Sequence, residues 1–235
     1  MKDVAEIIAA NVTRLRERID QAARRSGRKG DRIGLVAVTK YVDIDVARAL
    51  TEAGCVDLGE SRPQELWRKA DSLPGDSIRW HMIGHLQRNK VRRTLPYVSL
   101  LHSADRLRLL DEVSRISKEL SRMSSVLLEV NVSGDAAKHG FVPDEMVDVL
   151  AHVATLDHVR VRGLMAMAGW EGDLDAARAD FSRLRQLRDT LRTHCPPQVS
   201  LDELSMGMSG DFEVAIEEGA TLVRVGSALC EGLPQ

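Results

Sequence analysis

The chain contains 235 residues with a mass of 26.0 kDa, and its 33 basic and 35 acidic residues give a formal net charge of −2. This balance argues against a nucleic-acid partner, because proteins that neutralise phosphate backbones usually carry a basic excess. No apolar run approaches the roughly 20 residues that cross a bilayer, and the amino-terminal stretch MKDVAEIIAANVTRLRERID lacks the apolar core of a signal peptide, so we predict a cytoplasmic protein without a membrane partner.

The chain begins with a predicted helix over residues 3–25, where apolar side chains recur at helical spacing. From residue 33 onward, short apolar runs alternate with amphipathic segments. Runs such as IGLVAVT at 33–39 are typical of strands buried on both faces of a parallel sheet. In chain order the expected strand and helix pairs are 33–39 and 43–53, 55–59 and 63–73, 78–84 and 88–93, 98–102 and 106–122, 125–132 and 143–155, 159–167 and 174–193, and 201–206 and 212–218, followed by a last strand at 221–225.

This strict alternation predicts an α/β fold with a parallel sheet. An open doubly wound sheet usually has a glycine-rich loop after its first strand, but the first strand here runs into Thr39-Lys40-Tyr41-Val42 without a glycine. Eight units also match the number in a closed barrel. We therefore predict a single-domain (β/α)8 TIM barrel over residues 1–235, with an extra amino-terminal helix.

Ligand sites of such barrels lie at the carboxyl ends of the strands, and the first strand ends at Lys40. A lysine at this place can lie in a partly desolvated pocket, where its neutral amine is a nucleophile or a Schiff-base partner. The alternative is a side chain that extends past the strand end into solvent. Position alone leaves both interpretations open.

The last two strands carry the second signal. Residues 205–210 (SMGMSG) and Gly226-Ser227 follow strands seven and eight, where many barrels bind phosphate through backbone amides. Two ordinary turns are the alternative. Arg224 interrupts the apolar run of the last strand, and a charge at such a position needs a ligand or an ion-pair partner inside the barrel.

Metal and nucleophile motifs are weak. His81 and His85 lie four residues apart in a predicted strand, about 13 Å, which is too far to share an ion. His102, Ser103 and Asp105 suggest a triad, but the GxSxG elbow is missing. The three cysteines form no CxxC pair. We predict no metal.

A lysine, a phosphate cradle and a buried arginine together indicate one ligand, the phosphorylated ring aldehyde pyridoxal phosphate. Lys40 would hold it as an internal aldimine. Arg224 would face the pyridine nitrogen and keep it unprotonated, which weakens the cofactor as an electron sink.

The sequence resembles the YggS/PROSC family of pyridoxal phosphate homeostasis proteins, whose barrel is related to that of alanine racemase. Seven stretches in the family's order carry the resemblance: AVTKY (37–41), GESRPQE (59–65), WHMIGHLQRNK (80–90), EVNVSGDAAKHG (129–140), GLMAM (163–167), LSMGMSGDFEVAI (204–216) and VRVGSALCEG (223–232).

The resemblance implies a cytoplasmic carrier of pyridoxal phosphate that takes part in vitamin B6 homeostasis and is not an enzyme. Its partners would be the cofactor and pyridoxal-phosphate-dependent apoenzymes, and the protein would be a monomer or a weak homodimer. Ser61 stands where the family usually has asparagine. The sequence leaves open whether Lys90 or Lys138, both in loops near the predicted rim, holds a second cofactor molecule. The implied cofactor-binding residues are Lys40, Ser61, Ser205, Gly207, Ser209, Arg224, Gly226 and Ser227.

Two alternatives remain open. One is a pyridoxal-phosphate-dependent amino-acid racemase of the alanine racemase class, which needs a second base, typically a tyrosine brought by an added domain. The chain has only Tyr41 and Tyr97, and eight residues follow Ser227, so we expect no such domain. The other alternative is a sugar-phosphate isomerase or aldolase in which Lys40 reacts with the substrate.

Overall fold

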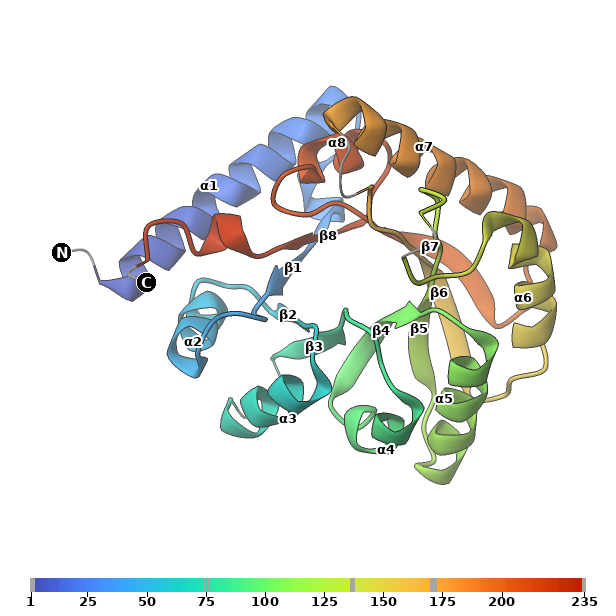
Figure 1. The fold of residues 1–235 in the computed structure, drawn as a ribbon. Helices are drawn as coiled ribbons and strands as arrows, with labels where there is room; N and C mark the ends of the chain where they lie inside the picture. Colours follow the sequence, from blue (N-terminus) through green and yellow to red (C-terminus); the bar gives the residue numbers. More distant parts are fainter. Residues whose placement is uncertain (1–2, 74, 76, 136–137, 170–172, 234–235) are drawn as a thin grey trace.

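Eight parallel strands form a closed barrel in sequence order, with the last strand paired to the first. The computed structural model describes residues 3–73, 75, 77–135, 138–169 and 173–233, so residues 136 and 137 of the 129–140 stretch lie outside the described part. Figure 1 shows the strands at the centre and the helices around them. The strands are β1 (Gly34–Val38), β2 (Asp57–Glu60), β3 (Arg79–Met82), β4 (Val98–Ala104), β5 (Ser124–Glu129), β6 (Val159–Met165), β7 (Val199–Ser205) and β8 (Leu222–Val225).

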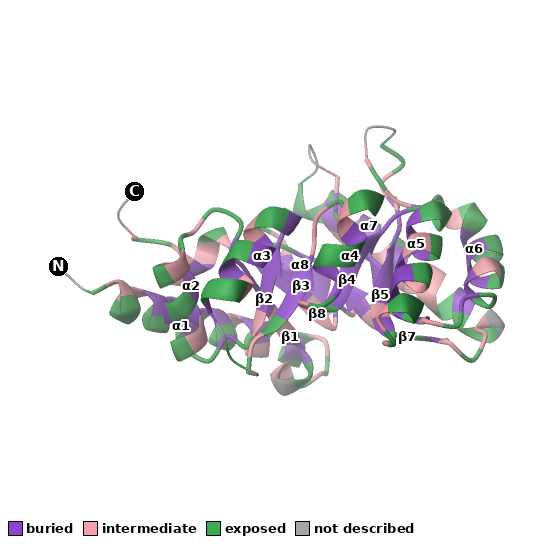
Figure 2. Cartoon of the chain, turned by 90° about the horizontal axis from the view of Figure 1, so that it is seen from below, coloured by how far each residue is buried: buried purple, intermediate pink, exposed green. Residues whose placement is uncertain are grey.

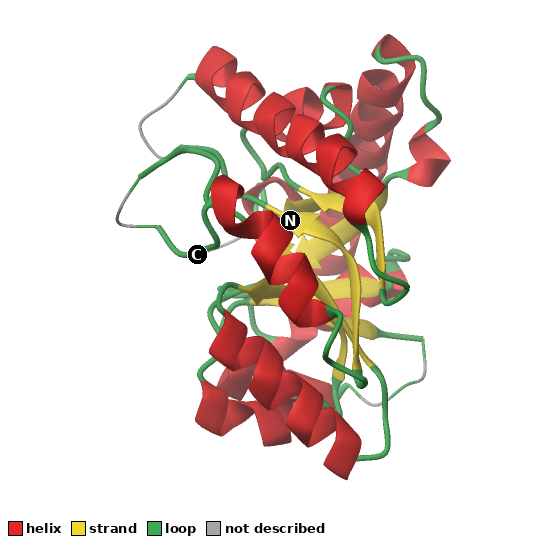
Figure 3. Cartoon of the chain, turned by 90° about the vertical axis from the view of Figure 1, so that its right-hand side faces the viewer, coloured by secondary structure: helices red, strands yellow, loops and turns green. Residues whose placement is uncertain are grey.

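The predicted barrel and its extra amino-terminal helix are confirmed. Helices cover the outside of the strands, as Figure 3 shows. They are α1 (Val4–Arg25), α2 (Ile44–Glu52), α3 (Pro63–Ser72), α4 (Val91–Thr94), α5 (Leu107–Glu119), α6 (Met146–Val153), α7 (Leu174–Leu191) and α8 (Phe212–Glu217). None of the helices in the described ranges is long and apolar enough to cross a membrane.

The extra helix α1 lies beside α8 in Figure 1 and is tied to the end of the chain. The buried Asn11 amide donates hydrogen bonds to the carbonyl oxygens of Leu229 and Glu231, at 3.0 and 2.9 Å. The apolar face of α1, including Ile8, Val12 and Leu15, packs into the main core. The helix therefore fixes the segment that follows β8.

Several strands end earlier than the apolar runs predict. β1 ends at Val38 and not at Thr39, and β5 ends at Glu129 and not at Val132. Beyond Glu129 the chain makes only an isolated bridge between Val130 and Phe141. Val130 and Val132, which follow the end of β5, are still buried. The apolar run in the sequence is therefore longer than the strand that forms hydrogen bonds with its neighbours.

The barrel interior is partly polar, although both faces of the strands are buried (Figure 2). Successive strand residues point to opposite faces. In β4, Leu101 belongs to the main core between strands and helices, whereas Leu100 packs with Leu127 and Met165 in a separate cluster inside the barrel. By the same alternation His102, Ser205 and Arg224 point inward.

Candidate functional site

Lys40 lies in the turn that follows β1, and its side chain is exposed. The strand ends two residues earlier, so the chain has left the barrel wall before it reaches the lysine. The Lys40 Nζ lies 4.9 Å from the centre of the Tyr41 ring, which is itself 84% exposed. The structure thus places the Lys40 side chain in solvent, which is one of the two arrangements that its position in the sequence leaves open.

A buried ion pair supports the turn that carries Lys40. Lys69 on α3 is 1% exposed, and its Nζ donates to Glu60 Oε1 and to the Thr39 carbonyl oxygen, each at 2.5 Å. The Thr39 hydroxyl donates to the same Glu60 oxygen at 2.8 Å. These contacts join the ends of β1 and β2, which brings Ser61, the residue after Glu60, to the same edge as Lys40.

The loops after β7 and β8 form a cradle of backbone amides. The N–H groups of Gly226 and Ala228 both point at the Ser209 hydroxyl oxygen, at 3.2 and 3.5 Å. A Cβ placed on Gly226 would lie 3.3 Å from the Cβ of Val38, so the cradle lies against the end of β1. The predicted residues of strands one, seven and eight thus meet at one edge.

Gly207 gives this cradle its shape. Its φ of +92° lies in the region that favours glycine, and an added Cβ would approach the Ala215 Cβ to 2.6 Å. Its carbonyl oxygen accepts a hydrogen bond from the Arg224 backbone N–H at 3.0 Å. A larger residue at 207 would push the loop off α8. Ser227, next to the cradle, is exposed.

Arg224 lies inside the barrel and is 4% exposed. Its guanidinium donates to the Ser205 hydroxyl at 2.6 Å, to the Ser205 carbonyl oxygen at 2.8 Å and to the Ala166 carbonyl oxygen at 3.0 Å. Burial lowers the pKa of Arg224 to about 10, against the opposing charges of Glu129 and Asp211. The group stays cationic at neutral pH without a direct carboxylate partner among the described residues.

A hydrogen-bonded chain connects Arg224 to the opposite mouth of the barrel. Ser205 contacts His102 Nδ1 at 2.9 Å, His102 Nε2 contacts His81 Nδ1 at 2.8 Å, and His81 Nε2 contacts Asp57 at 3.0 Å. Asp57 can only accept, so His81 Nε2 donates to it. When both imidazoles are neutral, every N–H and O–H along the chain then donates away from Arg224 and toward Asp57.

Burial and neighbouring charges shift the pKa values of His102 and Asp57, two members of this chain. Burial, together with the charges of His81 and Arg224, holds the pKa of His102 well below its usual range, so the ring is neutral. At Asp57 burial acts in the opposite sense, but hydrogen bonds from His81 and Arg79 bring its pKa down to about 2. Asp57 and His81 also line a hollow of about 460 Å³ at the amino-terminal mouth. This series of hydrogen bonds from Asp57 therefore holds the Ser205 hydroxyl, and through it the Arg224 guanidinium, in one orientation.

Glu129 is a site residue that we did not predict, although its motif is part of the family resemblance. It ends β5 and is 6% exposed. Burial and the charge of Asp105 raise the pKa of Glu129 to about 7, against the opposing charges of Arg224 and Arg106. A carboxyl group that titrates near neutral pH therefore lies close to the buried arginine.

The remaining candidates lie elsewhere on the rim. Lys138 donates to the carbonyl oxygen of Ala168 at 2.7 Å and so ties the loop after β5 to the loop after β6. Lys90 ends the short turn before α4. Ser103 donates to the Gly84 carbonyl oxygen at 2.6 Å, whereas His102 contacts Ser205. The suggested triad is therefore not assembled.

Comparison with known proteins decides the family. The family described as "Alanine racemase, N-terminal domain" matches residues 8–234. The pyridoxal phosphate homeostasis proteins of Aquifex aeolicus and Pseudomonas aeruginosa are each 39% identical to this chain. The first match spans 218 residues, 93% of this chain and 95% of its relative, and the second spans 222 residues, 94% of both. The chain belongs to the family of pyridoxal phosphate homeostasis proteins.

Solved structures of relatives agree with this membership. A protein of unknown function from Bifidobacterium adolescentis has a TM-score of 0.91 at 36% identity, with 97% of both chains covered. PipY of Synechococcus elongatus, solved with pyridoxal phosphate bound, has a TM-score of 0.82 at 32% identity, covering 94% of this chain and 99% of PipY. Alanine racemase from Clostridium difficile shares the fold alone, at a TM-score of 0.74 and 15% identity, and this chain covers 57% of it.

Proposed function

We propose that this chain binds pyridoxal phosphate at the carboxyl-terminal mouth of its barrel, through Lys40, and takes part in vitamin B6 homeostasis in the cytoplasm. The observation that carries the proposal is the cradle of Gly226 and Ala228 amides against the end of β1. The cradle offers anion donors beside the end of β1, which leads into the turn of Lys40, in a family whose relatives are named for this cofactor.

The residues present fit the cofactor. The two converging amides and the Ser209 hydroxyl match a phosphate, since backbone N–H groups that point at one spot form a ready anion site. Lys40 would hold the cofactor through its amine, to which the bound cofactor would offer an aldehyde group. Exposure of Lys40 leaves its amine accessible for this attachment.

The positive charge of Arg224 bears on how the pyridine ring of the cofactor would behave. A guanidinium held by Ser205 and the Ala166 carbonyl oxygen offers a positive charge inside the barrel. Facing a pyridine nitrogen, it would keep that nitrogen unprotonated. An unprotonated ring is a weaker electron sink, which disfavours reactions that need a fully delocalised carbanion.

The tyrosines also disfavour the racemase alternative. The Tyr97 hydroxyl is hydrogen-bonded to Asp71 on α3 at 2.8 Å, on the outside of the barrel. Tyr41 is 84% exposed beside Lys40. Neither is a buried, positioned second base, so we infer that the cofactor is held and passed on to other proteins.

Incubation with pyridoxal phosphate is expected to give a yellow protein whose visible band disappears with borohydride, and the added mass should lie on the Lys40 peptide. Lys40→Ala should abolish the band and the adduct, whereas Lys118→Ala, on the outer helix α5, should preserve both. A colourless wild-type protein would refute the proposal and favour the sugar-phosphate enzyme. Deuterium exchange at the α-carbon of amino acids would instead establish the racemase.

The cradle predicts a phosphate-dependent affinity. Ser209→Ala is expected to weaken pyridoxal phosphate binding about tenfold, because a hydrogen bond to a charged group is lost. Binding of pyridoxal, which lacks the phosphate, should change little. Equilibrium dialysis with both compounds measures the difference, and Ser200→Ala, at an exposed site of β7, is the matched control. Equal losses for both compounds would place the phosphate elsewhere.

A further inference from the structure

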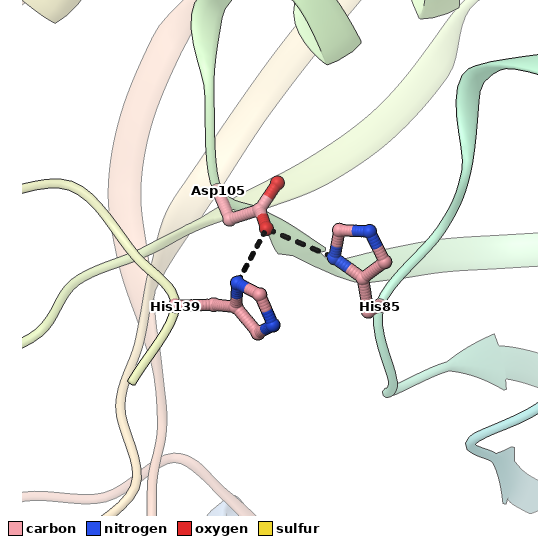
Figure 4. A group of neighbouring side chains, drawn as sticks. All are labelled: His85, Asp105 and His139. Carbon is pink, nitrogen blue, oxygen red and sulfur yellow. Dashed lines mark hydrogen bonds and ion pairs between the residues drawn. The ribbon is translucent and has the colours of Figure 1, made fainter. Parts of the chain in front are cut away.

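Three side chains that the proposed cofactor site does not use meet above the barrel. His85 follows β3, Asp105 follows β4, and His139 lies in the loop after β5, so each comes from a different loop. Figure 4 shows both imidazole rings turned toward the Asp105 carboxylate. His85 Nδ1 lies 3.1 Å and His139 Nδ1 lies 3.8 Å from the same oxygen, Asp105 Oδ2.

The spacing of these atoms suits a metal ion. The nearest nitrogen or oxygen atoms of the three side chains all lie within 4.8 Å of one another. Ligand atoms around a tetrahedral zinc lie about 3.4 Å apart, from bonds of about 2.0–2.2 Å. The two rings are stacked, with centres 4.8 Å apart and planes 25° apart, so a small rotation of each brings both Nδ1 atoms onto one ion.

We propose that His85, Asp105 and His139 form a binding site for a divalent first-row transition-metal ion of the zinc type, with a water molecule completing the coordination. Two imidazoles and one carboxylate favour such an ion over Ca²⁺ or Mg²⁺, which prefer oxygen ligands. The prediction of no metal considered spacing along the chain only, whereas the fold joins three loops 20 and 34 residues apart (85 to 105, 105 to 139).

The cluster already holds a cation, the guanidinium of Arg106. Its Nε donates to Asp105 Oδ1 at 2.9 Å, and its Nη2 lies 2.8 Å from Asp105 Oδ2 and 2.8 Å from His85 Nδ1. The Arg106 side chain is 45% exposed, so its end can turn into solvent. A metal on Oδ2 would take the place of Nη2, so the guanidinium and the ion compete for the same carboxylate oxygen.

The ion would lie at the edge of the proposed cofactor pocket. Asp105 and Arg106 are close enough to Glu129 to act on its charge, and Glu129 acts on Arg224. The ion would also fix the loop after β5 against the loops after β3 and β4. It would thus hold one side of the mouth, opposite the edge of β1, β7 and β8 that carries the phosphate cradle.

Cobalt binding tests the site. The full chain is freed of metal with a chelator and titrated with Co²⁺, whose visible absorption reports four-coordinate ligands, and Zn²⁺ is then added in competition. Measurements in the Lys40→Ala background keep cofactor complexes of Co²⁺ out of the signal and make the result independent of the proposed function. We expect saturable binding of one ion that Zn²⁺ displaces.

Variants assign the ligands. His85→Ala and His139→Ala should each weaken Co²⁺ binding by at least about tenfold. His139 is an exposed loop residue, so its variant remains informative if another fails to fold. His152→Ala is the matched control, because His152 pairs with Asp111 at 2.6 Å on the surface and the structure describes no third ligand beside it. It should leave the affinity unchanged.

Arg106→Gln gives the sharpest outcome. Removing the competing guanidinium should strengthen Co²⁺ binding, a result that random binding to surface histidines does not produce. The proposal is overturned if wild-type protein binds no Co²⁺, if the His85 and His139 variants bind as wild type does, or if Arg106→Gln weakens binding.

Discussion

Lys69→Met is expected to lower the free energy of unfolding by about 3–5 kcal/mol, because it leaves the Glu60 carboxylate buried without its cation. Glu60 is 0% exposed, and its second oxygen, Oε2, is buried without a hydrogen-bond partner in the described structure. Lys69 Nζ at 2.5 Å is therefore the main compensation for this charge. Urea unfolding followed by circular dichroism measures the loss.

Arg68→Met, one residue away on the same helix, is the matched control. Arg68 pairs with Glu65 across an exposed surface, so its loss should cost no more than about 0.5 kcal/mol. The double variant Glu60→Gln/Lys69→Met should recover part of the stability, since no buried charge is left. Similar losses for Lys69→Met and Arg68→Met would show that the buried pair contributes no more than a surface pair.

The same ion pair reaches the proposed site. Lys69 also donates to the Thr39 carbonyl oxygen, in the residue before Lys40. The Lys69 ammonium group therefore fixes the end of β1 from the side of α3, while the Lys40 side chain is exposed to solvent. This arrangement gives a physical reason for a lysine buried between α3 and the ends of β1 and β2, since a methionine of similar length could fill the space without holding the turn.

The fold was predictable because the two kinds of element differ in sequence. Each strand is a short apolar run, whereas apolar residues recur every three or four positions in the helices, so the alternation is visible along the chain. Lys69 was not singled out, although a signal exists: it lies three residues after Leu66 and four before Leu73, on the buried side of α3. A charge on that stripe indicates a buried partner.

The barrel interior was harder to predict. Strands buried on both faces show no alternation of polar and apolar residues, so a sequence does not tell which face of β3 or β4 points inward. The sequence offered His81 only as part of a weak metal motif and His102 only as part of a weak triad. The hydrogen-bonded chain from Asp57 to Arg224 depends on the strand register, which brings them together. The His85, Asp105 and His139 cluster depends on three loops, which leave no pattern in the sequence at all.

Glu129→Gln is expected to stabilise the protein at about pH 8 by about 2–3 kcal/mol and to have a much smaller effect at about pH 5. The folded-state pKa of Glu129, about 7, lies above the value of about 4.3 for an exposed glutamate. The folded state therefore binds the proton more tightly. Its stabilising effect is complete below about pH 4 and is lost as the pH rises to 7, where the buried group must ionise.

The measurement is thermal or urea unfolding of both proteins across this pH range, without cofactor. Taking the difference between wild type and Glu129→Gln removes the contributions of all other groups that titrate alike in the two proteins. Glu145→Gln, at an exposed position, measures the effect of a glutamate-to-glutamine change on the surface. A difference that stays constant from pH 5 to pH 8 would contradict a raised pKa at Glu129.

The same titration bears on cofactor binding. Below pH 7 the protonated Glu129 leaves the positive charge of Arg224 less compensated, and the mouth of the barrel becomes more favourable for an anion such as a phosphate. Above pH 7 the negative charge of the Glu129 carboxylate offsets the charge of Arg224 and repels the phosphate. Pyridoxal phosphate should therefore bind more weakly as the pH rises through 7, and Glu129→Gln should reduce this dependence while Ser209→Ala, which acts on the cradle alone, should leave it in place.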